Sequence, residues 1–133
     1  MVLDRRRRPL HFIASSLTDL RSVPVAVRGA FGRQLLDAQY GDTPASAKPL
    51  KGFGRASVLE LVEDEGSSTY RAVYTVRFER AVYVLHVFKK RSTKGIATSK
   101  GDMDLVRRRL QQAQHHYDQH DDRVESPKEG RNA

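Results

Sequence analysis

The sequence predicts a protein of the α+β class, in which helices flank a small sheet formed by the middle of the chain. Three observations predict this class. Residues 15–40 carry apolar side chains at helical spacing, residues 57–88 alternate in the manner of strands separated by tight turns, and a second amphipathic pattern begins at Asp102. At 133 residues, the chain has the length of one domain with a single modest core.

The N-terminal part is predicted to contain a basic tail, a short strand and two helices. Residues 1–9 include four consecutive arginines, which are typical of a flexible, solvated tail that could also bind nucleic acid. The apolar run at residues 10–13 favours an edge strand. Residues 25–40 present one apolar face at spacings of three and four, so residues 15–40 are expected to form a helical hairpin.

Three strands joined by tight turns are predicted next, from Ser57 to Glu63, from Thr69 to Phe78 and from Ala81 to Phe88. In the second strand the aromatic residues occupy one face and the arginines the other. The side chain of Arg71 is therefore expected to point away from the aromatic core face and toward an anionic partner. The third strand is apolar on both faces, as a central strand covered on each side would be.

The last predicted element is a helix from Asp102 to about Tyr117 with one apolar stripe. Asp102 and Asp104 fall in its first turn, where acidic side chains complement the helix dipole, and this structural role is favoured over metal binding. Residues 118–133 are polar, carry a net charge of −2 and are expected to be disordered.

Positive charge is concentrated in the second half of the chain. The formal net charge is +8, and between residues 67 and 116 eleven lysines or arginines oppose three acidic residues. Such a surface favours a polyanionic partner, nucleic acid first, although a basic surface can also serve solubility alone. Without cysteine there are no disulfides or thiolate metal sites, and without an apolar run of membrane-spanning length the sequence predicts a cytoplasmic protein with no membrane partner.

Four short motifs resemble the phage-derived Gp49-like group of HigB toxins within the RelE/ParE toxin superfamily. They are, in chain order, Lys48-Pro49-Leu50-Lys51-Gly52, Thr69-Tyr70-Arg71-Ala72-Val73-Tyr74, Tyr83-Val84-Leu85-His86-Val87-Phe88-Lys89-Lys90 and Gly95-Ile96-Ala97-Thr98. The resemblance implies a RelE-like toxin domain over residues 10–117. In that fold a compact, mainly antiparallel sheet carries the helical hairpin on one face and is followed by a C-terminal helix.

The resemblance also implies a function and a set of partners. It implies the toxin of a type II toxin–antitoxin pair, which is a metal-independent, cofactor-free endoribonuclease (an mRNA interferase) that cuts mRNA on the ribosome and inhibits translation. The expected partners are mRNA, ribosomal RNA and a HigA-like antitoxin with a helix-turn-helix domain, through which alone the toxin would reach operator DNA. The rival hypothesis is a non-catalytic module of the same fold that binds nucleic acid or a protein partner.

The residues present suit RNA cleavage, in which a 2′-hydroxyl attacks the adjacent phosphate, charge builds up on that phosphate and two protons move. By resemblance, Arg71 is expected to stabilise the transition state, because a guanidinium can grip two phosphate oxygens. Lys89 and Lys90 stand where relatives place a basic catalytic residue, and Lys90 is the first choice. Strict alternation would place Lys90 on the same face as His86, and Lys89 on the other face with Tyr83.

Two candidates keep a structural alternative. His86 has the intrinsic pKa for general acid or base catalysis, or it is a hydrogen-bonded core residue. Tyr74 could stack on a base, or it belongs to the core. The remaining cations are expected to hold the RNA backbone, and they are Lys48, Lys51, Arg55, Arg77, Arg91 and Lys94. His116 and His120 share a helical spacing but lack a third ligand, so no metal site is predicted.

Overall fold

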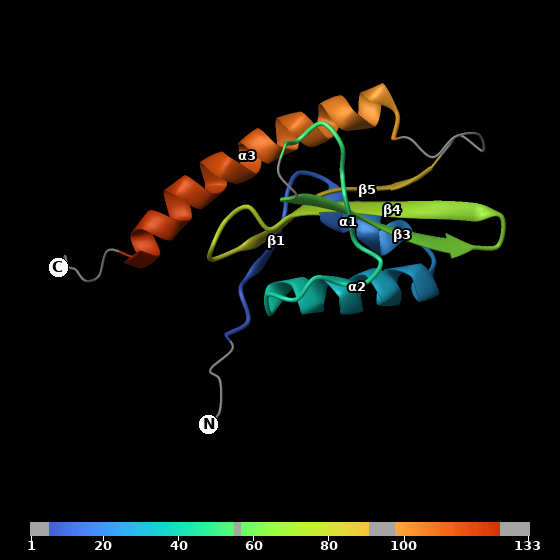
Figure 1. Cartoon of the computed structure of the whole chain (residues 1–133), viewed down its shortest axis with the longest axis horizontal. Coiled ribbons are helices and arrows are strands. Elements are labelled where there is room, and N and C mark those ends of the chain that lie inside the picture. Colours follow the sequence, from blue (N-terminus) through green and yellow to red (C-terminus); the bar gives the residue numbers. More distant parts are fainter. Residues whose placement is uncertain (1–5, 55–56, 91–97, 126–133) are drawn as a thin grey trace.

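The computed structural model describes residues 6–54, 57–90 and 98–125 (Figure 1). These residues form a five-stranded sheet in the order β1-β5-β4-β3-β2, in which β1 runs parallel to β5 and every other neighbouring pair is antiparallel. The strands are β1 (Leu10–Phe12), β2 (Lys48–Pro49), β3 (Val58–Glu65), β4 (Ser68–Thr75) and β5 (Val82–Lys89). The predicted α+β class and mainly antiparallel sheet are confirmed.

Three helices cover the sheet within this part of the chain, and they are α1 (Ser16–Ser22), α2 (Val25–Gln39) and α3 (Lys100–Glu125). The α1–α2 hairpin packs on one face, as predicted, and α3 crosses the other (Figure 1). The last helix continues to Glu125 instead of ending near Tyr117, so part of the segment predicted to be disordered is helical. A side-chain bond of 2.9 Å from Gln114 to Asp118, four residues on, supports this extension.

Arg8 belongs to the fold, although residues 1–9 are predicted to be a flexible tail. Its guanidinium Nη2 donates to the carbonyl of Ala38 at 2.7 Å, and its backbone N–H donates to the carbonyl of Gln39 at 2.9 Å. The side chain of Gln39 donates back to the carbonyl of Arg8 at 2.7 Å. A cation at this place gives the last carbonyls of α2 a further donor and complements the helix dipole.

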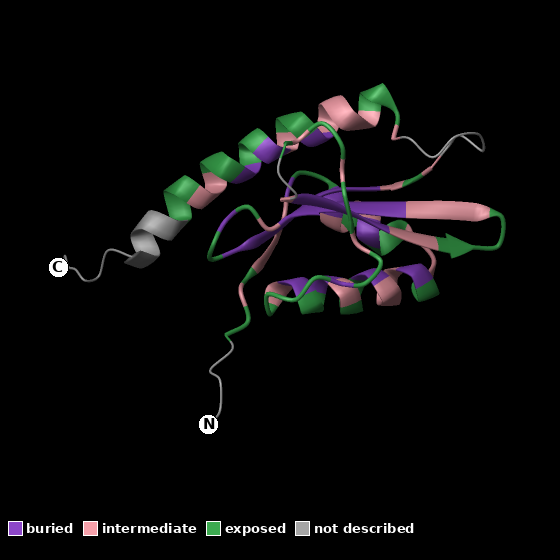
Figure 2. Cartoon of the chain, in the orientation of Figure 1, coloured by how far each residue is buried: buried purple, intermediate pink, exposed green. Residues whose placement is uncertain are grey.

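The middle of the sheet is buried on both faces, whereas the β3–β4 hairpin end is partly exposed (Figure 2). The core on the α2 side contains Phe31, Leu35, Tyr74 and Val84, and the core on the α3 side contains Val58, Val73, Leu85 and Val106. Because α3 covers the second face, that face is not an open platform for RNA. Arg71 does point away from the aromatic core of the α2 side, but its side chain is buried instead of reaching into solvent.

A β-bulge in β5 changes which residues share a face. Val73 pairs with His86, whereas Tyr74 pairs with Val84, so Leu85 has no partner in β4. One extra residue reverses the alternation between the two ends of a strand. Tyr83 therefore packs in the core on the α3 side, whereas Lys89 is paired with Tyr70 of the α2 side, and the predicted grouping of Lys89 with Tyr83 is wrong.

Candidate functional site

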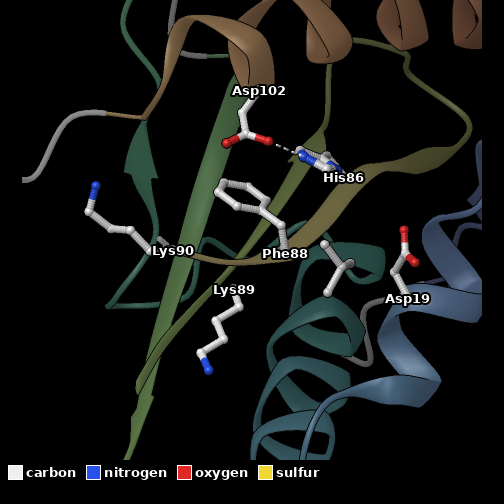
Figure 3. A pocket seen from close by; sticks show the side chains of 7 residues that line it. Asp19, His86, Phe88, Lys89, Lys90 and Asp102 are labelled. Atoms are coloured by element: carbon white, nitrogen blue, oxygen red, sulfur yellow. Dashed lines mark hydrogen bonds and ion pairs between the residues drawn. The ribbon is translucent and has the colours of Figure 1, made fainter. Parts of the chain in front are cut away.

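A cavity of about 600 Å³ lies where the end of β5 meets the first turn of α3 and the helix α1. Figure 3 shows its lining, which consists of Asp19, His86, Val87, Phe88, Lys89, Lys90 and Asp102. Three of these seven residues, His86, Lys89 and Lys90, are catalytic residues predicted from the sequence. The cavity therefore brings together groups that can carry a proton and groups that can neutralise a phosphate.

Asp102 and His86 form a hydrogen-bonded pair at one wall of this cavity. Nε2 of His86 lies 2.7 Å from Oδ1 of Asp102, and the hydroxyl of Ser99 donates to Oδ2 of Asp102 at 2.7 Å (Figure 3). The same hydroxyl accepts the backbone N–H of Asp102 at 3.1 Å, so Ser99 caps the start of α3 and fixes the carboxylate. The side chain of Asp102 is 31% exposed, whereas that of His86 is 9% exposed. Asp102 is thus the member of the pair that reaches solvent.

The surroundings of His86 favour its neutral form. Burial lowers the pKa of His86, and the hydrogen bond and charge of Asp102 oppose that shift only in part. The ring of Phe88 stacks on the imidazole at 4.3 Å, and Nδ1 is buried without a hydrogen-bond partner among the described residues. A neutral imidazole that donates from Nε2 to Asp102 fits this arrangement. The structural alternative for His86 agrees with its hydrogen bond and its burial. His86 also lines the cavity, and its role as general acid or base stays a prediction.

Lys89 and Lys90 leave the end of β5 in different directions (Figure 3). Lys89 is exposed and Lys90 is half-buried, and both line the cavity. The backbone N–H of Lys90 donates to the carbonyl of Thr69 at 2.8 Å, which extends the pairing with β4 by one residue. Lys90 follows Phe88 on the face of the sheet where α3 and Asp102 lie (Figure 3). The prediction that Lys90 shares a face with His86 therefore agrees with the structure.

Arg71 is held away from the cavity by an ion pair. Its Nη1 lies 2.8 Å from Oε1 of Glu60, and both side chains are 9% exposed. Oε2 of Glu60 accepts the hydroxyl of Thr98 at 3.0 Å, and Arg71 is not among the cavity-lining residues. The predicted contact between this guanidinium and a phosphate is therefore not available in this conformation. The cause is the acidic residue on the neighbouring strand, which sequence alternation alone does not pair with Arg71.

Two further predicted RNA contacts lie elsewhere. Tyr74 is 0% exposed and its hydroxyl has no partner among the described residues, and burial raises its pKa to about 12. Stacking on a base is thus excluded for Tyr74, and the core alternative is correct. Arg77 is exposed, but it follows the other end of β4 and donates from Nε to the hydroxyl of Ser57 at 3.4 Å.

The loop after β2 packs on α3 and keeps its lysines outside. Lys48 and Lys51 are exposed, while Leu50 and Phe53 pack against the core on the α3 side. The guanidinium of Arg107 lies 5.4 Å from the centre of the Phe53 ring, a cation–π contact. Neither lysine lines the cavity. The three other predicted backbone contacts, Arg55, Arg91 and Lys94, lie outside the described residues.

Asp102 and Asp19 are the acidic cavity residues that sequence reasoning did not assign to the site. The motif Ser99-Lys100-Gly101-Asp102 is a capping pattern that marks a helix start, and this signal could have placed Asp102. Asp19 ends the same kind of pattern, Ser16-Leu17-Thr18-Asp19, and it reaches the cavity from α1. Within the described residues, no group of three or more His, Cys, Asp or Glu side chains could hold a metal ion. No helix in the same ranges is both long and apolar enough for a membrane span.

Comparisons with solved structures identify the fold. A double arginine-to-alanine variant of the E. coli toxin RelE in the free state aligns with a TM-score of 0.52 and 17% identity, over 80% of this chain and 98% of that one. The isolated E. coli RelE toxin aligns with a TM-score of 0.49 and 24% identity, over 76% of this chain and 97% of that one. A chain of the RelBE2 toxin–antitoxin complex of Mycobacterium tuberculosis aligns with a TM-score of 0.43 and 19% identity, over 65% of this chain and 98% of that one.

The family follows from the sequence comparison. No curated protein matches the chain. Residues 18–111, which are most of the chain, match the family described as phage-derived protein Gp49-like (DUF891). The predicted family and the predicted RelE-like fold are confirmed. The chain belongs to the Gp49-like family of phage-derived proteins and has the fold of RelE.

Proposed function

We propose that this protein is the toxin of a type II toxin–antitoxin pair, an endoribonuclease that cuts mRNA on the ribosome without a metal ion and so stops translation. Its family and its RelE-like fold support the proposal. The observation that carries it is one cavity in which a carboxylate–imidazole pair, Asp102 and His86, lies beside Lys89 and Lys90. These are the groups that metal-free cleavage of a phosphodiester requires.

Each group has a role in the proposed reaction. The 2′-hydroxyl of the RNA loses its proton as it attacks the neighbouring phosphate, and the departing 5′-oxygen gains one. Asp102 accepts the first proton because it is the exposed member of the pair, and His86 orients it through the 2.7 Å bond. The ammonium group of Lys90 gives a proton to the departing 5′-oxygen, and the ammonium group of Lys89 neutralises the charge that accumulates on the phosphate.

Arg71 has a supporting role in this proposal instead of a direct one. Its ion pair with Glu60, which also binds Thr98, connects β4, β3 and the residue two positions before α3. That connection steadies the entry to the helix whose first turn presents Asp102. Arg71 would contact a phosphate only after leaving Glu60.

Mutation of Asp102 tests the proposed chemistry. Asp102→Asn should keep the bond with Ser99 and lower ribosome-dependent cleavage of a translated mRNA by about a hundredfold or more, because a general base is lost. Asp104→Asn is the matched control, since Asp104 lies in the same helix and contacts Lys100 and Arg107 outside the cavity. Cleavage should be mapped by primer extension on purified ribosomes. Equal cleavage by Asp102→Asn and the wild type would refute the proposed role.

The proposal includes a neutralising partner. A helix-turn-helix antitoxin encoded beside this chain should bind it, stop the cleavage and bring the pair to operator DNA. Co-expression of the neighbouring reading frame should restore growth in cells that express this protein, and the two chains should co-purify. If growth stops with and without that frame, the antitoxin is encoded elsewhere or does not exist.

A non-catalytic binding module is the second candidate function, and two observations favour it. Arg71 is engaged by Glu60, and Nδ1 of His86 is buried. A module of this kind would bind RNA or a protein partner and leave translated messages intact. The cleavage assay with the wild-type protein separates the two candidates directly.

A further inference from the structure

We infer that a second cavity, at the other end of β5, binds one nucleotide of single-stranded RNA. The inference deepens the proposed function, on which it rests for the choice of RNA as the ligand. This cavity of about 510 Å³ is bordered by residues 6–9 before β1, by the β4–β5 turn and by the second half of α3. None of its lining residues belongs to the first cavity.

The floor of this cavity belongs to a cluster of aromatic rings from three elements, in which His11, Tyr83 and His120 line the cavity and His116 contacts all three. The rings of His116 and His120 stack in parallel at 3.8 Å, and His11 lies 4.7 Å from His116 and 5.0 Å from Tyr83. The hydroxyl of Tyr83 and Nδ1 of His116 are 2.7 Å apart, which fixes the inner imidazole. His120 is exposed and lines the cavity, so the outer face of this stack can receive another ring. Unstacked RNA bases bind to aromatic and histidine rings in this way.

The rim of the cavity is cationic. Arg6, Arg7, Arg8 and Arg80 contribute to the lining, and Glu79 is the acidic residue among the lining side chains. Arg8 is used by the end of α2, and Arg6 and Arg80 also have interactions within the chain. Arg7 is exposed at the rim and is the residue on which the test rests. Rings on the floor and cations at the rim match the base and the phosphate of a nucleotide.

The second cavity opens along the same side of α3 as the first. Asp102 lines the first cavity, Arg109 binds the carbonyl of Leu85 and the hydroxyl of Ser15, and His116 contacts His11. These helix residues recur at intervals of seven, so they form one stripe that faces β1, β5 and α1. A single RNA strand that passes over the partly exposed outer edge of this stripe can reach both cavities. The second cavity would then hold a nucleotide at a distance from the bond that is cut.

The test measures binding of an RNA that is long enough to reach both cavities and carries 2′-O-methyl riboses, which prevent cleavage. His120→Ala should raise the dissociation constant roughly tenfold, which is the usual loss of affinity when a stacking ring is removed. His115→Ala is the matched control, since His115 is the exposed α3 histidine outside the cavity. Arg7→Ala should reduce the slope of log K against log salt by about 0.7, as expected for one lost phosphate contact. Arg33→Ala, on the exposed side of α2, should leave that slope unchanged.

Two further readouts identify the source of the affinity. The ring resonances of His11 and His120 should shift when the RNA is added to the full chain, and inorganic polyphosphate should bind without any loss in His120→Ala. Equal losses in His120→Ala and His115→Ala, or RNA binding without shifts of these rings, would overturn the inference. Each of these experiments measures binding, so the inference can be supported when the cleavage assay fails. It can also be overturned when the cleavage assay succeeds.

Discussion

The ion pair of Arg71 and Glu60 determines how either residue can act. Both side chains are nearly buried, and burial of one charge without the other is costly. Arg71→Ala should therefore destabilise the protein by about 3–5 kcal/mol, measured by urea denaturation, and any loss of activity would be ambiguous. The double variant Glu60→Leu with Arg71→Met removes both charges and should stay within about 1 kcal/mol of the wild type or exceed it.

The same double variant separates support from catalysis. With Arg71 in a supporting role, a folded double variant should keep mRNA cleavage within about tenfold of the wild type, whereas loss of a charge that stabilises the transition state costs about a hundredfold or more. A folded double variant that is inactive would mean that Arg71 stabilises the transition state directly, as the sequence predicts.

Titration of His86 should make stability depend on pH. Burial lowers the pKa of His86 below its ordinary value of 6.5 in the folded protein, so the unfolded chain binds the proton more readily. Stability should fall as the pH drops below about 6.5, by at most about 1.4 kcal/mol per pH unit for this one proton. His86→Gln should make the curve of unfolding free energy against pH shallower. His115→Gln, at an exposed position, should leave the curve as it is in the wild type.

Among the elements, the loop after β2 depends on a glycine that touches α3. Gly52 has φ of +97°, and a Cβ there would lie 3.2 Å from Nη2 of Arg107 and 3.3 Å from Cε of Met103. Gly54 has φ of +72° but no atom within 4 Å of such a Cβ. Gly54→Ala should cost about 1 kcal/mol from backbone strain alone, and Gly52→Ala should cost more. Thermal unfolding of both variants measures the difference, and equal costs would mean that the contact with α3 is negligible.

The elements also show how far sequence patterns reach. Periodicity predicted the helical hairpin, the edge strand and the three central strands, because each has a face with a consistent environment. It did not predict the bulge at Leu85, which breaks the alternation that the face assignment assumes. Nor did it predict that α3 continues to Glu125, because a polar helix of this kind lacks the apolar signal that marks a helix.

At the scale of the whole molecule, the sequence predicted several residues of the candidate site, but it predicted only part of how they are arranged. His86, Lys89 and Lys90 lie around one cavity because they are near neighbours on one strand. The partner of His86, Asp102 on α3, comes from a distant segment, and this pair depends on how the helix docks on the sheet. The partner of Arg71, Glu60 on the neighbouring strand β3, depends on the register of the two strands. Single-sequence patterns carry no information on that docking.

The whole molecule also makes a prediction about RNA length. Asp102 and His120 lie 18 positions apart on α3, which corresponds to roughly 27 Å along a helix. An RNA long enough to reach both cavities binds the second one at a high effective concentration, so affinity should rise sharply at that length. In His120→Ala this rise in affinity with RNA length should disappear. RNAs that are too short to span the two cavities should bind the variant and the wild type equally when they occupy the first cavity. A series of uncleavable RNAs measured by fluorescence anisotropy gives both curves. A gradual increase with length that is the same in both proteins would mean that the two cavities do not bind one strand together.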